Sequence, residues 1–362
     1  MKGFLAGAAA LLLSSSVLAS QVKISEISYN YPDSKEKQYL LPWVTIKDNP
    51  QAARRINDYI FSRFASHLPG KDPQATLNRL AKAGMDPIAS LSWSRVETTP
   101  RILTLDIFAE GCGAYCESWD TFLSFDLRSG TLINLDDVVT PDTRTRLNDL
   151  VRADVRQQIT TFVAQQKALS TEEQRLEDDE YVDYQEFYAS CLARTETGTY
   201  YANDFSLAKN NFVFHNERCS NHASRALDEL DTFTSKVPVA DMRSNLTPYG
   251  LSLLTTDATS TVTPPPSLNG RLLYGTLGEK TPVVLNITCR ETSLDGAYFY
   301  SRFGAAIELH GTCPTAGDQP YVMKTYSEDG VTETMTLTQA EGKYIGEWHA
   351  GDKVLPIEFA LF

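Results

Sequence analysis

The segment from Ile102 to Val139 constrains the fold of this chain more than any other. It contains two stretches in which apolar and polar residues alternate, ILTLDIF and WDTFLSFDL, and a short loop bounded by two cysteines joins them. Alternation with a period of two, between turns that contain glycine, predicts half-buried antiparallel strands. Gly130 in the next turn can adopt a positive φ, so the chain can fold back toward the segment LINLDDVV, which we expect to complete the meander. We therefore expect this segment to form the centre of an antiparallel sheet.

Segments on both sides of the meander supply further strands and several helices. Asn49-Pro50, Asp72-Pro73 and Thr140-Pro141 each place a capping residue before a proline, and this pattern predicts the start of a helix. Apolar residues recur at helical spacing after the first and the third of these pairs. The other predicted elements are strands at 22–31, 39–46, 88–98 and 233–242 and a hairpin at 204–214.

The last quarter of the chain has a different composition. Residues 255–267 are rich in Thr and Ser and contain three consecutive prolines, which predicts an extended linker. Beyond it, Gly-x-aromatic pairs recur between short alternating stretches, a pattern typical of a small barrel or sandwich. The expected fold class is therefore α+β, with an antiparallel sheet packed by helices in residues 21–254 and a small all-β domain in residues 268–362. Because such a linker implies few contacts across it, we expect the C-terminal domain to fold alone.

The first residues predict export. Lys2 precedes an apolar stretch from Phe4 to Leu18, and Val17-Leu18-Ala19 supplies a small-residue cleavage pattern. We expect a signal peptide in residues 1–20, cleavage near Ala19-Ser20, and a periplasmic or secreted mature protein. No later stretch approaches the roughly 18 apolar residues of a membrane-spanning helix, so no membrane span is expected.

Six cysteines remain after the expected cleavage. An even number of cysteines in an exported chain favours disulfide bonds over metal binding or thiol catalysis. Their order along the chain suggests one pairing among those that six cysteines allow: Cys112 with Cys116, Cys191 with Cys219, and Cys289 with Cys313.

The charge of the chain bears on its partners. A formal net charge of −13 disfavours nucleic acid, whose phosphates require a basic surface, and suits a basic protein partner. Eight carboxylates lie between Glu172 and Glu186, with Tyr181 and Tyr184 among the aromatic residues between them. Tyrosine beside carboxylates is a composition that interfaces use, although an exposed helix end would also explain it.

Motifs of exported enzymes and metal sites are missing from the sequence. It contains no Gly-x-Ser-x-Gly elbow, no HExxH and no Walker loop. His215, Cys219 and His222 have the spacing of metal ligands, but a zinc site needs a fourth ligand and a free thiolate, and the expected disulfide takes up Cys219. We therefore predict no metal and no cofactor.

Paired carboxylates are the remaining candidates for catalysis. Asp136 and Asp137 are adjacent, and on a strand they would point to opposite faces, so they could not flank one glycosidic bond. As a turn-and-cap group before the predicted helix they have an ordinary structural use. Asp120 and Glu117 near the cysteine loop are better placed, but the sequence shows no acid–base partner for them. We predict no catalytic residues.

The meander resembles a domain found in the RsiV-like family, which includes a lysozyme-sensing anti-sigma factor and accessory regions of some peptidoglycan deacetylases. Cys112-Gly113-Ala114-Tyr115 matches the first motif of this family, Phe125-Asp126 with Ser129-Gly130 the second, and the segment 135–139 the third. The resemblance covers about residues 22–250. Tyr115 stands where the family usually has histidine, and two cysteines bracket the loop, so a role that rests on that histidine does not carry over.

The resemblance implies binding rather than turnover. We expect an exported, non-enzymatic binding protein that recognises or inhibits a cell-wall hydrolase, either a lysozyme or another muramidase, or an antibacterial toxin to which it confers immunity. The alternatives are a cell-envelope enzyme that acts on glycan and a structural envelope module. The residues expected to contact the partner are Tyr115, Glu117, Trp119, Asp120, Tyr181, Asp183 and Tyr184.

Overall fold

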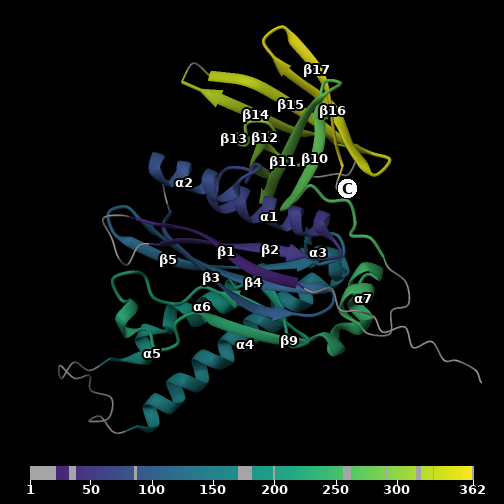
Figure 1. Cartoon of the computed structure of the whole chain (residues 1–362). Helices are drawn as coiled ribbons and strands as arrows, with labels where there is room; N and C mark the ends of the chain where they lie inside the picture. Colours follow the sequence, from purple (N-terminus) through teal and green to yellow (C-terminus); the bar gives the residue numbers. More distant parts are fainter. Residues whose placement is uncertain are drawn as a thin grey trace, which may run out of the picture.

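The fold is that of a computed structural model and combines three sheets with several helices (Figure 1). The residues that it describes are 22–31, 38–84, 88–169, 182–198, 200–255, 262–290, 292–314, 319–328 and 330–360. The expected signal peptide and Tyr181 lie outside the described residues. The α+β class, with an all-β C-terminal part, is confirmed.

A six-stranded sheet with the order β1-β2-β3-β4-β5-β6 forms the centre of the molecule. Its strands pair antiparallel, except that β2 and β3 are parallel. The predicted meander supplies the longest pairing, in which Ile102 to Cys112 lies against Cys116 to Asp126. The strands are β1 (Val22–Asn30), β2 (Gln38–Ile46), β3 (Ile88–Thr98), β4 (Ile102–Cys112), β5 (Cys116–Asp126) and β6 (Thr131–Leu132).

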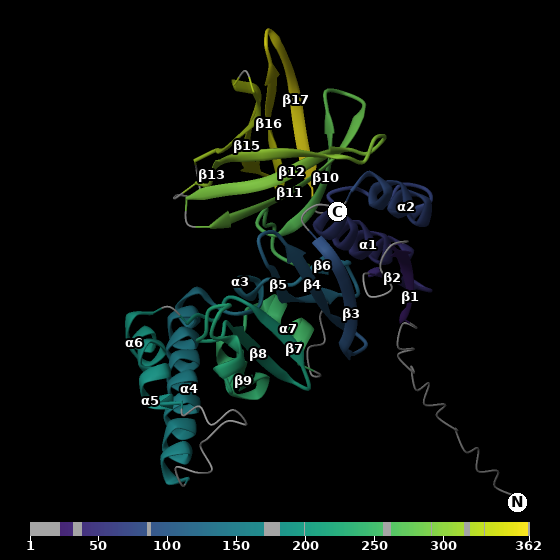
Figure 2. The same cartoon turned by 90° about the vertical axis from the view of Figure 1, so that its left-hand side faces the viewer.

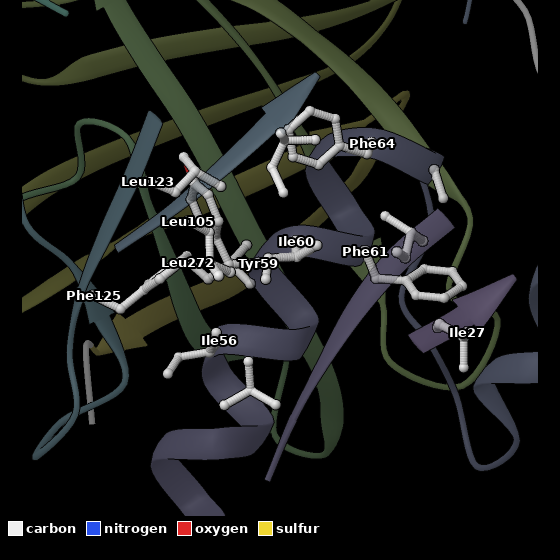
Figure 3. Close-up of a cluster of buried hydrophobic side chains, with 14 of the residues drawn as sticks. Ile27, Ile56, Tyr59, Ile60, Phe61, Phe64, Leu105, Leu123, Phe125 and Leu272 are labelled. Atoms are coloured by element: carbon white, nitrogen blue, oxygen red, sulfur yellow. The ribbon is translucent and has the colours of Figure 1, made fainter. Parts of the chain in front are cut away.

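One face of this sheet is apolar and is covered by α1 (Pro50–Ala65), with α2 (Pro73–Ala83) beside it. The helix α1 begins where predicted, since the Asn49 side chain accepts a hydrogen bond from the Ala52 amide at 3.1 Å. Ile56 and Ile60 pack against Leu105 and other inward residues of β4 and β5 (Figure 3). The turn after β5 closes against α1 as well, because Gly130, with φ of 75°, lies so near the Ala52 carbonyl that a Cβ atom would clash.

The opposite face of β4 and β5 is polar, and a second sheet packs on it (Figure 2). Thr104 donates to the Leu207 carbonyl at 2.7 Å, and Ser124 accepts from the Leu207 amide at 3.2 Å. The two hydroxyls hydrogen-bond to each other at 3.0 Å, so they link the sheets through the main chain of one residue. The second sheet comprises β7 (Phe205–Ala208), β8 (Asn211–Asn216) and β9 (Phe233–Pro238) in that order.

Helices enclose the second sheet and form a second apolar core with it. The long helix α4 (Pro141–Ala168) packs on this core through its buried face. The apolar residues of that face are Leu147, Val151, Val155 and Ile159. The remaining helices are α3 (Leu135–Val138), α5 (Tyr184–Phe187), α6 (Ala189–Thr197), α7 (Pro248–Leu254) and the 3-10 helices η1 (Arg225–Leu227) and η2 (Val239–Asn245).

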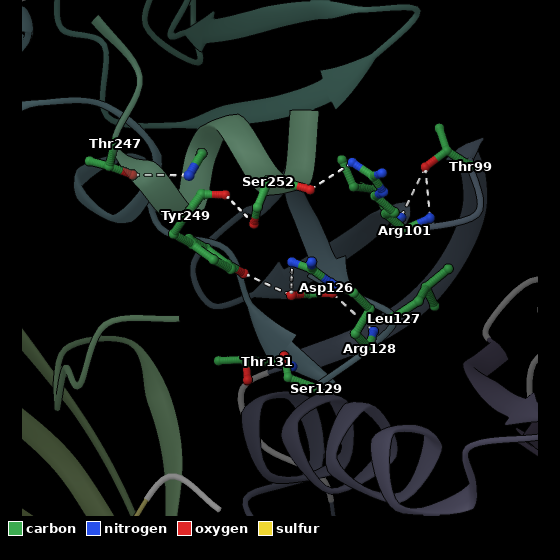
Figure 4. Close-up of polar contacts among 12 residues, drawn as sticks. Thr99, Arg101, Asp126, Leu127, Arg128, Ser129, Thr131, Thr247, Tyr249 and Ser252 are labelled. Carbon is green, nitrogen blue, oxygen red and sulfur yellow. Dashed lines mark hydrogen bonds and ion pairs between the residues drawn. The ribbon is translucent and has the colours of Figure 1, made fainter. Parts of the chain in front are cut away.

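Polar side chains hold α7 to the end of the central sheet (Figure 4). Arg101 donates to the carbonyl oxygens of Ser252 and Thr255, each at 2.6 Å. Tyr249 donates to the buried carboxylate of Asp126 at 3.1 Å, and Arg128 pairs with the same carboxylate. These contacts place the chain that follows α7 beside the central sheet.

Asp136 and Asp137 lie in the short helix α3, so the expectation that they continue the meander as a strand is wrong. The Asn134 amide donates to the Asp137 carboxylate at 2.9 Å, which starts a helical turn instead. Their use as a turn-and-cap group agrees with the sequence analysis.

The C-terminal strands close into an eight-stranded barrel, since β17 pairs with β10. Within the described ranges, no helix is long and apolar enough to cross a membrane. The strands are β10 (Arg271–Leu277), β11 (Thr281–Arg290), β12 (Ser293–Tyr300), β13 (Ala306–Thr312), β14 (Tyr321–Ser327), β15 (Gly330–Ala340), β16 (Lys343–Ala350) and β17 (Lys353–Ala360).

The expectation of few contacts between the barrel and the preceding part is wrong. Leu272, Val284 and Phe299 of the barrel belong to the same apolar core as α1, which lies between the barrel and the central sheet (Figure 1). Arg271 is fully buried and pairs with the buried carboxylate of Asp137 on α3. The proline-rich composition describes the local chain only, whereas the apolar contacts come from the outer surface of the barrel.

The six cysteines lie in three pairs at disulfide distance: 112 with 116, 191 with 219, and 289 with 313. These are the pairs that the sequence order suggests. Three disulfides fit a protein that resides in an oxidising, extracytoplasmic compartment.

Peptide mapping of the exported protein without reduction is expected to recover these three linkages. An oxidising compartment keeps neighbouring thiols joined, and each closed loop stabilises the fold by about 2–4 kcal/mol. Free thiols at Cys289 and Cys313 would contradict the linkage between the ends of β11 and β13.

Replacement of the buried Arg271 is expected to destabilise the protein. Arg271→Met should lower the free energy of unfolding by about 3–5 kcal/mol, because Asp137 then stays buried without its cation. The double variant Arg271→Met with Asp137→Asn should recover most of this loss. Denaturant unfolding of the single and the double variant measures both changes in free energy.

The exposed pair of Arg156 with Glu196 offers a matched control. Arg156→Met should change the free energy of unfolding by less than about 1 kcal/mol. Equal effects of Arg271→Met and Arg156→Met would show that the buried pair is not the contact that holds the barrel.

Candidate functional site

A cleft opens where the two sheets diverge, beyond the hydroxyl contacts of Thr104 and Ser124. Its volume is about 840 Å³. One wall is the part of β5 from Glu117 to Phe122, and the other consists of residues 215–225, from the end of β8 onward. Phe108, Arg194 and residues within 200–204 and 231–234, around the starts of β7 and β9, complete the lining. We call this space the inter-sheet cleft.

Three carboxyl groups, from Asp106, Asp120 and Asp204, meet at the inner end of the inter-sheet cleft. Asp106 pairs with Phe122 and Phe108 with Asp120 in the β4–β5 register, so both aspartates lie on the polar face of the sheet. Asp204 precedes β7, and its main-chain carbonyl accepts a hydrogen bond from the His215 amide at 2.9 Å.

These carboxyl groups hold protons more tightly than exposed ones do. Burial raises the pKa of Asp106 to about 6, and the charge of Asp120 and a hydrogen bond with it add to this effect. Burial likewise raises the pKa of Asp204 to about 6, with contributions from the charges of Asp120 and Asp106. Burial also raises the pKa of Asp120. A hydrogen bond between two carboxyl groups requires a proton on one of them.

His215 lies beside this group but is held in place by other contacts. Its ring stacks on Phe122 with 3.6 Å between centroids, and Nε2 lies 2.9 Å from the Ser206 hydroxyl. Burial lowers the pKa of His215 to about 4, so the imidazole is neutral at pH 7. Ser206 is 1% exposed, which prevents its hydroxyl from reaching a substrate as a nucleophile. The pair therefore serves to join β7 to β8.

Exposed aromatic side chains surround the mouth of the inter-sheet cleft. Phe108, Trp119 and Tyr201 are 40%, 41% and 44% exposed, and all three belong to its lining. Tyr115 lies in the loop closed by the first disulfide, is 58% exposed, and stacks on His222 with 4.4 Å between ring centroids. Exposed aromatic residues gathered in one place are typical of a recognition site.

Ion pairs connect the cysteine loop to the far wall of the cleft. The Glu117 carboxylate lies 3.3 Å from the Arg218 guanidinium and 3.0 Å from His222. Arg218 is 16% exposed at its side chain, so this pair is partly shielded from water. The loop that carries Tyr115 is thus fixed both by its disulfide and by the Glu117 contacts.

Buried polar atoms without hydrogen-bond partners gather at the same place. Among the described residues there are four: Asp106 Oδ1, Asn216 Nδ2, Arg218 Nε and Ser220 Oγ. Asn216, Arg218 and Ser220 belong to the lining, and Asp106 bonds to a lining residue. A second cavity, of about 510 Å³ between Arg101 and Leu253, contains none of these atoms in its lining. Since folded proteins satisfy nearly all buried polar groups, this concentration indicates a site for a polar ligand.

The structure brings together four of the residues expected to contact a partner and separates the others from them. Tyr115, Glu117, Trp119 and Asp120 lie at or beside the mouth of the inter-sheet cleft. Tyr184 and Asp183 do not line it.

Burial rules out the expected contact role of Tyr184. This side chain is 8% exposed and packs against Phe162 and Tyr188 in the second core. Asp183 caps α5 by accepting hydrogen bonds from the Gln185 and Glu186 amides. The mixture of tyrosines and carboxylates in this segment therefore reflects helix capping and packing in its described part.

Sequence patterns did not identify Asp106, Asp204, Asn216 and Ser220. Asp106 places a carboxylate in the middle of β4, between Leu105 and Ile107, and this was the one available signal. The other three residues gave none, because they reach the cleft only through the packing of β7 and β8 on the central sheet.

No family model matches this sequence, and no curated protein matches it. Among the solved structures that match this chain are two proteins of the DUF3298 family. A member of the DUF3298 family from Bacteroides fragilis has 17% identity and a TM-score of 0.42, and the match covers 63% of this chain and 95% of that one. A DUF3298 family protein from Pseudomonas aeruginosa PAO1 has 10% identity and a TM-score of 0.38, with the same coverage.

Stability is expected to depend on pH through Asp106. Because its pKa is raised on folding, the folded protein binds more protons than the unfolded chain between about pH 4 and pH 6, so stability falls as the pH rises through this range. Asp106→Asn removes this penalty. The variant should be more stable than the parent by about 1 kcal/mol at pH 7.5, a value reduced for solvent screening of a half-exposed group, and by much less at pH 4.

Denaturant unfolding at the two pH values measures the difference. Asp352→Asn, in the exposed turn before β17, should change stability equally at both. If the stability gained by Asp106→Asn does not grow with pH, the raised pKa of Asp106 is contradicted.

Proposed function

We propose that this protein is an exported binding protein that recognises a basic cell-wall hydrolase, such as a muramidase or an antibacterial toxin, at the mouth of the inter-sheet cleft. The observation that carries this proposal is the loop of Tyr115, which presents an exposed aromatic ring on a base closed by a disulfide. A rigid loop loses little conformational entropy when it binds, so more of its contact energy appears as affinity.

The surroundings of the loop fit a basic partner. Glu117 and Asp120 lie beside Tyr115 and Trp119, and the whole chain carries a net charge of −13. Complementary charge accelerates the approach of a cationic protein, while aromatic anchors at the centre of an interface supply most of the affinity. The sequence resemblance to RsiV-like domains points to the same class of partner, and the expected signal peptide would place both proteins in the periplasm or outside the cell.

An enzyme that acts on glycan is the second candidate, favoured by the raised pKa of Asp204, which suits a general acid. Asp106 and Asp120 do not provide the required pair, because carboxyl groups that hydrogen-bond to each other leave no room for a glycosidic bond between them. The geometry therefore supports binding better than hydrolysis.

Binding to a panel of lysozymes and other muramidases, measured by calorimetry, is expected to identify at least one partner. Tyr115→Ala and Trp119→Ala should each weaken binding by about 2 kcal/mol, or roughly thirtyfold in Kd, since they remove the anchors. Tyr326→Ala on the barrel, where Tyr326 is 57% exposed, is the matched control and should have no effect.

Ionic strength separates the contribution of the carboxylates from that of the aromatic anchors. The substitutions Glu117→Gln and Asp120→Asn should lower the association rate at low ionic strength, and physiological salt should remove most of that difference. Absence of binding to every muramidase tested would contradict the partner class. Binding that is indifferent to Tyr115 and Trp119 would contradict the site.

A further inference from the structure

We infer that the inter-sheet cleft is a saccharide-binding site, which accepts a short oligosaccharide of neutral or amino sugars. This inference goes beyond the proposed function; it shares Asp120 with that proposal but does not depend on Tyr115, which does not line the cleft. It rests on the unpartnered polar atoms, the aromatic side chains and the charge of the lining.

The unpartnered atoms require a ligand with many hydrogen-bonding groups. Asn216 Nδ2 and Arg218 Nε are donors, Ser220 Oγ can donate or accept, and Asp106 Oδ1 accepts unless it carries the shared proton. A sugar ring presents hydroxyl groups that both donate and accept, so it matches both the donors and the acceptors among these atoms. The Asn216 Oδ1 atom already accepts from the Tyr201 amide at 3.1 Å, which orients its Nδ2 group.

Aromatic rings supply the other half of sugar recognition. The C–H bonds on one face of a pyranose ring form an apolar surface that packs on an aromatic ring. Phe108 and Tyr201 offer exposed rings at the mouth, beside planar carboxylate and amide groups such as Asp120 and Asn203, each of which can bind two neighbouring hydroxyls. The volume of about 840 Å³ lies within the range of small-molecule clefts.

The charge of the lining selects among sugars. It contains five carboxylates and three arginines, and His215 is neutral because burial lowers its pKa. This excess of two negative charges disfavours phosphorylated or uronic sugars, whereas an amino group would be attracted toward Asp120 and Asp204. The carboxylates of Asp120 and Asp204 in the lining can accept hydrogen bonds from hydroxyl or amino groups of the sugar.

Titration calorimetry of the full-length protein with three trisaccharides tests the inference. The probes are the trimer of N-acetylglucosamine, the trimer of glucosamine, and trigalacturonate as the anionic comparator. We expect saturable binding of at least one of the first two at submillimolar to millimolar concentration and none of the third. No binding of either of the first two, or tighter binding of trigalacturonate, would overturn the inference.

Variants of the cleft locate the site. Asn216→Asp keeps an acceptor for the Tyr201 amide, replaces the Nδ2 donor with an acceptor oxygen and adds a negative charge, and it should weaken binding of the neutral N-acetylglucosamine trimer about tenfold. Phe108→Ala should have a similar effect, while Phe108→Trp, which keeps an aromatic face, should retain binding and so exclude misfolding as the cause. Saccharide binding that is unchanged in both Asn216→Asp and Phe108→Ala would overturn the inference.

Two controls keep this result separate from the proposed function. Tyr115→Ala should weaken the muramidase complex and leave saccharide binding unchanged, and Tyr326→Ala should change neither. Loss of saccharide binding in Tyr115→Ala but not in Phe108→Ala would overturn the placement of the saccharide in the cleft.

Discussion

The architecture depends on the hydrogen bonds that link Leu207 to the hydroxyls of Thr104 and Ser124. They let a polar face of the central sheet be buried, because each hydroxyl both donates and accepts and no buried group at this point is left without a partner. Further along the same strands, the stacking of His215 on Phe122 also joins the two sheets. Beyond this contact, Phe108 and Asp120 line the inter-sheet cleft.

The cleft concentrates the groups that folding leaves least satisfied. The charge of Asp120 raises the pKa of Asp106, and the charges of Asp120 and Asp106 raise the pKa of Asp204. Three of the four described buried polar atoms without partners belong to residues that line the cleft. Such an arrangement reduces stability, and the two apolar cores on either side of it offset the cost. Ionisable groups with shifted pKa values, held in a stable fold, are typical of binding and catalytic sites.

The barrel is joined to this framework through α1 and through the buried pair of Arg271 and Asp137. Nearly every face of α1 is buried, since one side packs on the central sheet and the other on β10 to β12. A buried ion pair contributes little net stability but is costly to break, so it specifies one orientation of the barrel. The barrel therefore supports the central sheet from the side opposite the cleft.

The local patterns of the sequence determined the strands of the meander, the starts of α1, α2 and α4, the all-β class of the C-terminal part and the order of the cysteine pairs. Each depends on residues near one another in the chain, so periodicity and turn chemistry suffice. Only the tertiary structure placed Asp204 and Asn216 beside Asp106, buried Tyr184 in a core, turned Asp136 and Asp137 into a helix, and joined the barrel to α1. These outcomes follow from which surfaces meet when distant segments pack, and a pattern read along one segment contains no information about the surface that will cover it.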